Sequence, residues 1–223
     1  MIAKTSPVRL VAAAEPCLQL AYRRYQLRPQ HGRPAVRCNM LVAHATGLCK
    51  EVYAPLLDRI GTADGEAITL DMRNHGDSML ANRPAFDSGK ATTVAMEDYS
   101  KDIGACMEAL AMDSRRVPII GIGHSAGATG ILLVEAARPG TFSAIVAIDP
   151  VLSVVDLHDA SQPAAARYMN DVSERLAAMV RRRRDRWPDR AAAHAYLNGR
   201  GIYANWSKDA FDAFISVLTA TLR

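Results

Sequence analysis

The 223-residue sequence has few cysteines and no pattern that would give them a shared role. Its four cysteines, Cys17, Cys38, Cys49 and Cys106, form no C-x-x-C pair and have no histidine at metal-ligand spacing. Zinc sites require closely spaced cysteine and histidine ligands, and thioredoxin-type redox sites require a C-x-x-C pair. We therefore expect reduced, intracellular thiols, no metal site and no cofactor.

A long apolar run is also missing near the N-terminus. The apolar patch within the first sixteen residues, Val8 to Ala14, is short and is interrupted by Arg9. A signal peptide needs a continuous apolar stretch, and a membrane-spanning helix needs about 20 such residues. We expect no signal peptide, no membrane span and an intracellular location.

Basic residues are not spread along the chain, although its net charge is +4. Residues 181–190 hold six arginines and two aspartates, so this segment alone accounts for the whole excess. Nucleic-acid binders usually carry basic residues along one face with interleaved aromatics, and the sequence has no such stripe. We expect no nucleic-acid partner. The run Arg181 to Arg184 is typical of a solvated helix face, with binding of an anionic substrate as the alternative.

Apolar runs alternate with helix-like spacing over the first 150 residues. Strands are predicted at 17–27, 36–43, 67–70, 117–122 and 143–148, and helices at 51–60, 96–112 and 125–137. A long polar loop is predicted at 72–92, which holds the turn-forming residues Asn74, Gly76, Asn82, Pro84 and Gly89. Such alternation is typical of an α/β fold with a mostly parallel sheet and helices on both faces.

Past Pro150 the character of the sequence changes. Residues 160–223 are rich in alanine, arginine and isolated aromatics, with helical spacing and no clear strand. We expect two parts, an α/β core at 1–150 and a helical cap or lid at 151–223, laid over the carboxyl edge of the sheet where ligands bind in open α/β folds. Four aromatic residues of this part either line an apolar pocket or pack the cap onto the core: Trp187, Tyr196, Tyr203 and Trp206.

One serine stands between two glycines in Gly123-His-Ser-Ala-Gly127, after a predicted strand and before a predicted helix. In such a strand-to-helix turn the hydroxyl is exposed, and only small neighbours keep the backbone clear of other elements. The helix that follows directs free N–H groups and its positive end toward the serine. We predict Ser125 as a nucleophile and the N–H of Ala126 as an oxyanion donor.

A second oxyanion donor is expected from the loop after an earlier strand. His44-Ala-Thr-Gly47 directly follows the predicted strand at 36–43, and its glycine allows a backbone N–H to turn toward the site. The N–H of Thr46 is the first candidate, with Ala45 and Gly47 as alternatives. An ordinary strand-to-helix turn is the other interpretation of this loop.

Three motifs together resemble the α/β-hydrolase superfamily: the loop His44-Ala-Thr-Gly47, the segment Asp71-Met-Arg-Asn-His-Gly-Asp-Ser78, and Gly123-His-Ser-Ala-Gly127. The segment at 71–78 is similar to the superfamily's D-x-R-G-H-G-x-S, with Asn74 in place of a glycine. The loop at 44–51, with Tyr53 and Pro55, resembles fungal peroxisomal lipases and toxin-biosynthesis hydrolases. The superfamily resemblance covers about residues 17–150. It implies the α/β-hydrolase fold and a cytoplasmic or peroxisomal location.

The resemblance also implies that a nucleophile, an acid and a histidine follow one another along the chain. Asp149, at the end of the predicted strand 143–148, is the candidate acid, and closing the turn is its alternative role. No histidine suits the role of base: His31, His44 and His75 precede Ser125, His124 adjoins it, His158 follows Asp149 by only nine residues, and His194 lies in the predicted cap. We therefore expect the chain to be truncated relative to the family and to lack its last strands.

Two functions remain open. The first is a serine hydrolase of esterase or lipase type, in which Ser125 attacks the carbonyl of a small hydrophobic acyl substrate while Ala126 and Thr46 hold the oxyanion. A serine at this position argues against dehalogenase and epoxide-hydrolase chemistry, whereas reactions on thioesters or carbon–carbon bonds stay open. The second is a catalytically incomplete chain that binds a small hydrophobic ligand or a protein partner. The sequence does not give the oligomeric state.

Overall fold

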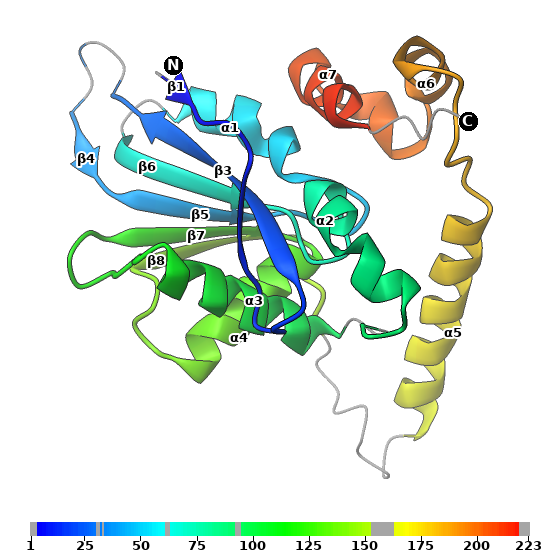
Figure 1. Cartoon of the computed structure of the whole chain (residues 1–223), viewed down its shortest axis with the longest axis horizontal. Coiled ribbons are helices and arrows are strands. Elements are labelled where there is room, and N and C mark those ends of the chain that lie inside the picture. Colours follow the sequence, from blue (N-terminus) through cyan, green and yellow to red (C-terminus); the bar gives the residue numbers. More distant parts are fainter. Residues whose placement is uncertain are drawn as a thin grey trace. The chain divides into compact units, whose positions relative to one another are not determined.

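The structure is a computed structural model that describes residues 4–29, 32, 34–60, 63–91, 95–152 and 163–218. Within these residues the strands form one eight-stranded sheet (Figure 1). Its path runs through β1 (Lys4–Thr5), β3 (Gln19–Leu27), β6 (Ala63–Leu70), β5 (Asn39–Ala43), β7 (Ile119–His124) and β8 (Ala144–Ile148). Two short strands lie off this path, β2 (Arg9–Ala12) beside β3 and β4 (Val36–Arg37) beside β6.

Most of the sheet is parallel, as the alternating pattern predicts. Strands β6, β5, β7 and β8 run in one direction, whereas β3 is antiparallel to β6, and β1 and β2 are antiparallel to β3. Helical crossovers between successive strands allow the parallel pairing. The predicted fold class is therefore confirmed. The sequence pattern does not predict β1 and β2, because β2 is largely exposed and has no apolar alternation.

Helices cover both faces of the sheet because side chains alternate along each strand. The helices of this part are the 3₁₀-helix η1 (Lys50–Tyr53), α1 (Ala54–Arg59), α2 (Gly76–Asp87), α3 (Met96–Ala109) and α4 (Ala126–Ala137). Leu41 of β5 packs with Ile131 of α4 in one hydrophobic cluster. The preceding Met40 faces the other side and packs with Leu57 of α1. Figure 1 shows α1 on one face and α3 and α4 on the other.

The prediction of a loop at 72–92 is wrong over most of its length, because α2 occupies Gly76–Asp87. The buried side chains of α2 are the polar Ser78 and Asn82, which hydrogen-bond to main-chain carbonyl groups of the preceding loop. A helix that faces the core with polar side chains lacks the apolar spacing by which helices are recognised. Pro84 lies inside this helix although proline is normally a turn signal.

After β8, the described residues 163–218 form helices and connecting turns: α5 (Pro163–Arg181), α6 (Arg190–Leu197), the 3₁₀-helix η2 (Gly201–Asn205) and α7 (Lys208–Val217). The chain divides into two compact units. One contains the sheet together with the residues from Leu197 through α7, and the other contains α5 and most of α6. The predicted helical character of this region is confirmed, and the assignment of 151–223 as one cap stays a prediction.

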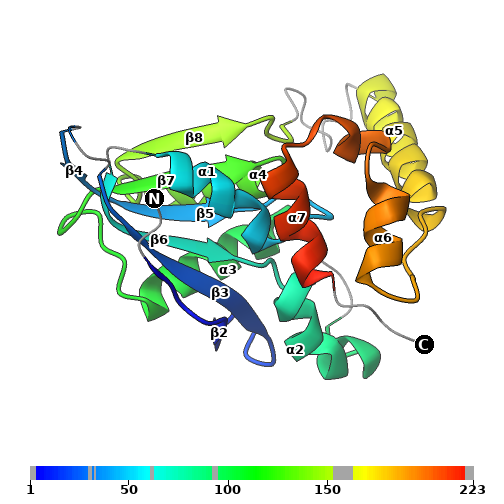
Figure 2. The ribbon, with the colours of Figure 1, turned by 90° about the horizontal axis from the view of Figure 1, so that it is seen from above.

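Helix α7 packs onto the loop that follows β5. Phe211 and Phe214 lie in a hydrophobic cluster with Ala45 and Leu48 of that loop, and Figure 2 shows α7 beside α1. Tyr203 and Trp206 pack against the same cluster. For these two aromatics the packing interpretation is confirmed.

Candidate active site

Ser125 lies in the turn between β7 and α4. Its φ of 52° and ψ of −121° are a conformation that costs a non-glycine residue about 1–3 kcal/mol. Main-chain hydrogen bonds stabilise this conformation: the Ser125 N–H donates to Ile148 O at 2.9 Å, and the Ser125 carbonyl accepts from the Thr129 N–H at 3.1 Å. The turn therefore fixes the serine at the carboxyl end of the parallel strands.

The two glycines of G-x-S-x-G are required by close contacts between main chains. A Cβ on Gly123 would lie 2.3 Å from the Cα of Ala128, and a Cβ on Gly127 would lie 2.3 Å from the carbonyl oxygen of Ala43. Main-chain atoms cannot rotate aside as the end of a side chain can. The motif is therefore set by the tight packing of α4 against the ends of β5 and β7.

The loop after β5 offers three main-chain N–H groups as predicted oxyanion donors. The Ala45 N–H donates to Tyr53 Oη at 3.2 Å, and the Gly47 N–H donates to His75 Nε2 at 2.9 Å. Among the residues that the structure describes, the N–H groups of Thr46 and Ala126 have no acceptor. Of the three alternatives in this loop, Thr46 is the one whose N–H remains available.

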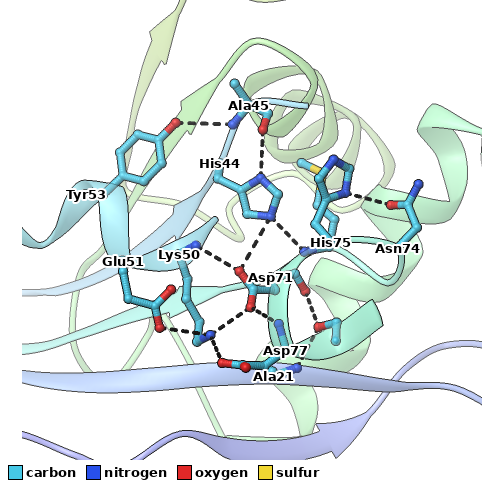
Figure 3. Close-up of polar contacts among 12 residues, drawn as sticks. Ala21, His44, Ala45, Lys50, Glu51, Tyr53, Asp71, Asn74, His75 and Asp77 are labelled. Carbon is cyan, nitrogen blue, oxygen red and sulfur yellow. Dashed lines mark hydrogen bonds and ion pairs between the residues drawn. The ribbon is translucent and has the colours of Figure 1, made fainter. Parts of the chain in front are cut away.

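A buried ion cluster ties the loop after β5 to the loop after β6 (Figure 3). Lys50 Nζ lies 2.7 Å from Asp71 Oδ2, 2.6 Å from Asp77 Oδ2 and 2.9 Å from Glu51 Oε1. The main-chain N–H of Lys50 also donates to Asp71 Oδ1 at 2.8 Å. Burial alone would lower the pKa of Lys50, but the carboxylates of Asp71 and Asp77 outweigh it and raise that pKa. Lys50 therefore carries its charge inside the protein.

Two histidines complete the tie between these loops. His44 donates from Nδ1 to Ala45 O at 2.8 Å and accepts at Nε2 from the Met72 N–H at 3.0 Å, while His75 accepts from Gly47. Burial lowers the pKa of His44 to about 4 and that of His75 to about 3. The lone-pair nitrogen of each ring is already engaged. Both side chains therefore hold the loop and are not placed to accept a proton from Ser125.

His124 precedes Ser125, but its ring is directed to Tyr53. The Tyr53 hydroxyl accepts from the Ala45 N–H and donates to His124 Nδ1 at 2.9 Å. Tyr53 thus connects the loop after β5 with the turn that carries Ser125. Burial lowers the pKa of His124, and the charge of Asp149 partly offsets this effect.

Asp149, the predicted acid, directly follows β8 at the same edge of the sheet. Its φ is 45°, and the preceding residue, Ile148, accepts the Ser125 N–H at 2.9 Å, which places Asp149 beside the Ser125 turn. The described imidazoles of the unit that holds Ser125, which are His44, His75 and His124, form their hydrogen bonds with other groups than the Ser125 hydroxyl or Asp149. His31 and His158 lie outside the described residues, and His194 lies on α6. The role of Asp149 stays a prediction.

The arginine run lies apart from this site in sequence, in the second unit. Arg181 to Arg184 are exposed, as a solvated face would be, but the predicted helix face is wrong for most of the run, because α5 ends at Arg181 and the next three arginines follow it. The Arg184 guanidinium stacks over the rings of Trp187 and Tyr196, 5.9 and 5.2 Å from their centroids. These contacts give two of the four predicted aromatics a partner within their own unit.

In the part of the chain that the structure describes, no group of three or more histidine, cysteine, aspartate or glutamate side chains could hold a metal ion. The described helices also include none that is long and apolar enough to cross a membrane.

Comparison with known families decides the relationship of the chain. Residues 34–221 match the family described as serine aminopeptidase, S33. The chain belongs to this α/β-hydrolase family. The strand–turn–helix at Ser125 and the loops after β5 and β6 are thus features of an S33-family chain.

Two curated relatives of this S33-family chain are fungal. The peroxisomal membrane protein LPX1 of Saccharomyces cerevisiae is 26% identical over 198 residues, which are 84% of this chain and 51% of that protein. The type I acyl-CoA thioesterase mpaH of Penicillium roqueforti is 24% identical over 203 residues, which are 89% of this chain and 43% of that protein. The chain spans about half the length of the curated relatives it matches.

Solved structures give the same fold. Peroxisomal α/β-hydrolase Lpx1 from S. cerevisiae has a TM-score of 0.66 at 23% identity, covering 96% of this chain and 60% of that one. E-2-(acetamidomethylene)succinate hydrolase has a TM-score of 0.63 at 23% identity, covering 95% of this chain and 64% of that one. The predicted α/β-hydrolase fold and the resemblance to a fungal peroxisomal hydrolase are confirmed.

Proposed function

We propose that the chain is an acyl hydrolase of esterase or lipase type and that Ser125 is its nucleophile. The observation that carries the proposal is the φ of 52° that Ser125 adopts between β7 and α4. Backbone strain of this kind persists where the surrounding structure enforces it, and it is concentrated at active sites. Membership in a hydrolase family supports the reaction class, and the strand–turn–helix context supports the serine as nucleophile.

In the proposed reaction, a histidine base takes the proton of the Ser125 hydroxyl while Oγ attacks the acyl carbonyl carbon and the carbonyl electron pair moves onto oxygen. The N–H groups of Ala126 and Thr46 stabilise that oxyanion, and one such donor typically contributes about 10²–10³ in rate. The tetrahedral intermediate then expels the alcohol or thiol, which takes that proton from the base, and water later hydrolyses the acyl-enzyme, releasing the carboxylic acid and restoring the Ser125 hydroxyl. Asp149 is proposed as the acidic residue of the catalytic triad, whose carboxylate would orient the histidine base.

The proposed substrate is a small hydrophobic ester or thioester. Phe211 and Phe214 of α7 are buried against the loop that carries Thr46, so the main-chain atoms of the proposed oxyanion donor adjoin an apolar cluster. The name of the Penicillium relative, an acyl-CoA thioesterase, supports an acyl thioester as one form of substrate. The name of the yeast relative supports a peroxisomal location.

One observation favours a second function. The Ser125 hydroxyl has no hydrogen-bond partner among the described side chains, so no described group is placed to remove its proton. Under this second proposal, the chain binds a small hydrophobic ligand or a protein partner without turnover.

Hydrolysis of p-nitrophenyl butyrate and of a butyryl thioester separates the two functions. We expect release of product by the wild type at about ten times the buffer rate or more, and release at the buffer rate by Ser125→Ala. Ser88→Ala is the matched control, because Ser88 is exposed at the end of α2, and it should equal the wild type. Equal rates for the wild type and Ser125→Ala would rule out the nucleophile, whereas saturable binding without release would support the second function.

A further inference from the structure

Asn74 stands where the D-x-R-G-H-G-x-S segment of the superfamily has a glycine. We infer that Asn74 is a positioning residue, which fixes the tautomer of His75 and thereby holds the loop that presents the Thr46 N–H. The inference rests on the proposed function, because the oxyanion role of Thr46 belongs to that proposal.

The Asn74 side chain accepts two hydrogen bonds at one oxygen. His75 Nδ1–H donates to Asn74 Oδ1 at 2.8 Å, and the Tyr99 hydroxyl donates to it at 3.1 Å. Figure 3 shows Asn74 directed at the His75 ring. The Gly47 N–H can only donate and needs the lone pair of His75 Nε2, so the ring proton lies on Nδ1 and the group of Asn74 that meets it is the amide oxygen, not the NH₂ group. The oxygen therefore faces the ring nitrogen that carries the proton.

The proton on Nδ1 decides what the other nitrogen of His75 can do. A neutral imidazole has one N–H and one lone pair, so His75 Nε2 is the acceptor for the Gly47 N–H at 2.9 Å. The opposite tautomer would place an N–H of His75 against the N–H of Gly47, which is two donors and no acceptor. Glycine at position 74 has no side-chain oxygen that could select between the tautomers.

The bond to Gly47 closes the turn beside Thr46. Gly47 has a φ of 80°, a left-handed conformation that glycine adopts without strain. Ala45, on the other side of Thr46, is held by Tyr53 at 3.2 Å. Hydrogen bonds on both sides thus fix the direction of the Thr46 peptide, and the bond on the Gly47 side depends on His75.

Burial is the main reason that the His75 ring stays neutral. Burial and, to a smaller extent, the neighbouring His44 ring at 5.0 Å lower the pKa of His75, Asp71 opposes them in part, and the net result is a pKa of about 3. Protonation would fill the lone pair at Nε2 and remove the acceptor for Gly47. The tie is therefore present above the pKa of His75 and is lost as the pH falls through it.

Three substitutions separate the parts of this inference. Asn74→Leu keeps the volume and removes the oxygen acceptor, whereas Asn74→Gly restores the residue of the superfamily segment. Asn74→Asp keeps an acceptor for Nδ1–H but adds a negative charge, which favours imidazolium and raises the pKa of His75. We therefore expect the three variants to differ in how the His75–Gly47 hydrogen bond responds to pH.

Nuclear magnetic resonance of the whole protein tests the hydrogen-bond chain without using activity. We expect the Nδ1–H tautomer of His75 in the wild type and its loss in Asn74→Leu and Asn74→Gly, with about five- to tenfold faster amide exchange at Gly47, the size expected for one hydrogen bond. In Asn74→Asp, protection of Gly47 should persist at neutral pH and be lost at a higher pH than in the wild type. An Nε2–H tautomer in the wild type, or an unchanged Gly47 exchange rate in Asn74→Leu, would overturn the inference.

The rate of Ser125 labelling by a fluorophosphonate tests the consequence for the oxyanion site. Asn74→Leu should lower the maximal labelling rate about fivefold with little change in the apparent affinity for the reagent, and Asn74→Asp should shift the acid limb of the pH profile upward. A purely structural role would change the melting temperature but would leave that pH profile in place, which would count against the inference. If the wild type labels no faster than Ser125→Ala, the proposed function fails, and the His75 tautomer and Gly47 exchange still decide the hydrogen-bond chain.

Discussion

Replacing Lys50 by methionine is expected to lower the free energy of unfolding by about 3–5 kcal/mol. The Lys50 ammonium faces the carboxylates of Asp71, Asp77 and Glu51, and Asp71 is fully buried. Methionine has a similar length but no charge, so Asp71 would become a buried charge without a counter-ion. Equilibrium unfolding in urea, followed by circular dichroism, measures the loss.

A matched control is Lys208→Met. Lys208 is 84% exposed and pairs with Asp212 on the same helix, and pairs of this kind contribute about 0.5 kcal/mol or less. The loss of unfolding free energy caused by Lys50→Met should also become smaller as the pH falls. Burial already raises the pKa of Asp71, loss of Lys50 raises it further, and a protonated carboxyl needs no counter-ion. Equal losses for the two lysine variants, or a deficit independent of pH, would contradict the role of the cluster.

Replacing Gly127 by alanine is expected to destabilise the protein by about 3 kcal/mol. The new Cβ would lie 2.3 Å from the Ala43 oxygen and 2.6 Å from the His44 oxygen. Both are main-chain atoms at the end of β5, so α4 must move away from the sheet and carry the Ser125 turn with it. The urea midpoint and the slope of the unfolding curve report the loss.

Gly130→Ala, one turn further along α4, is the control for this substitution. Its Cβ would meet the end of the Ile103 side chain, Cδ1, at 2.9 Å, and that group can rotate. Alanine inside a helix is also favoured over glycine by about 1 kcal/mol. A Gly127→Ala variant as stable as Gly130→Ala would show that the contact with Ala43 does not constrain the turn.

The sequence predicts those elements whose pattern is apolar and local. β7 and α4 are predicted within two residues of their bounds because an apolar run is followed by small residues and then by helical spacing. Helix α2 is missed because Ser78 and Asn82 are its buried side chains. The antiparallel direction of β3 is also missed, because it depends on pairing with β6, far along the chain.

The residues of the candidate site likewise fall into those that the local sequence indicates and those that depend on contacts between distant segments. Ser125 and Ala126 can be recognised from neighbouring residues. The choice of Thr46 depends on the partners of the other two donors: Ala45 bonds to Tyr53, 8 residues away, and Gly47 bonds to His75, 28 residues away. The motif at 71–78 draws attention to Asp71 and His75 without showing what they hold. Lys50 and Asp71 are 21 residues apart and meet because β5 and β6 pair in parallel. Such contacts follow from the fold and are not visible in a local pattern.

Labelling of the purified protein with a fluorophosphonate, followed by peptide mass spectrometry, tests the central claim most directly. A nucleophile supported by backbone donors predicts one covalent adduct on the peptide that contains Ser125, formed faster than with free serine. The adduct should be absent from Ser125→Ala and from protein unfolded in urea, and present in Ser88→Ala. Wild-type protein that labels no better than Ser125→Ala would contradict the account.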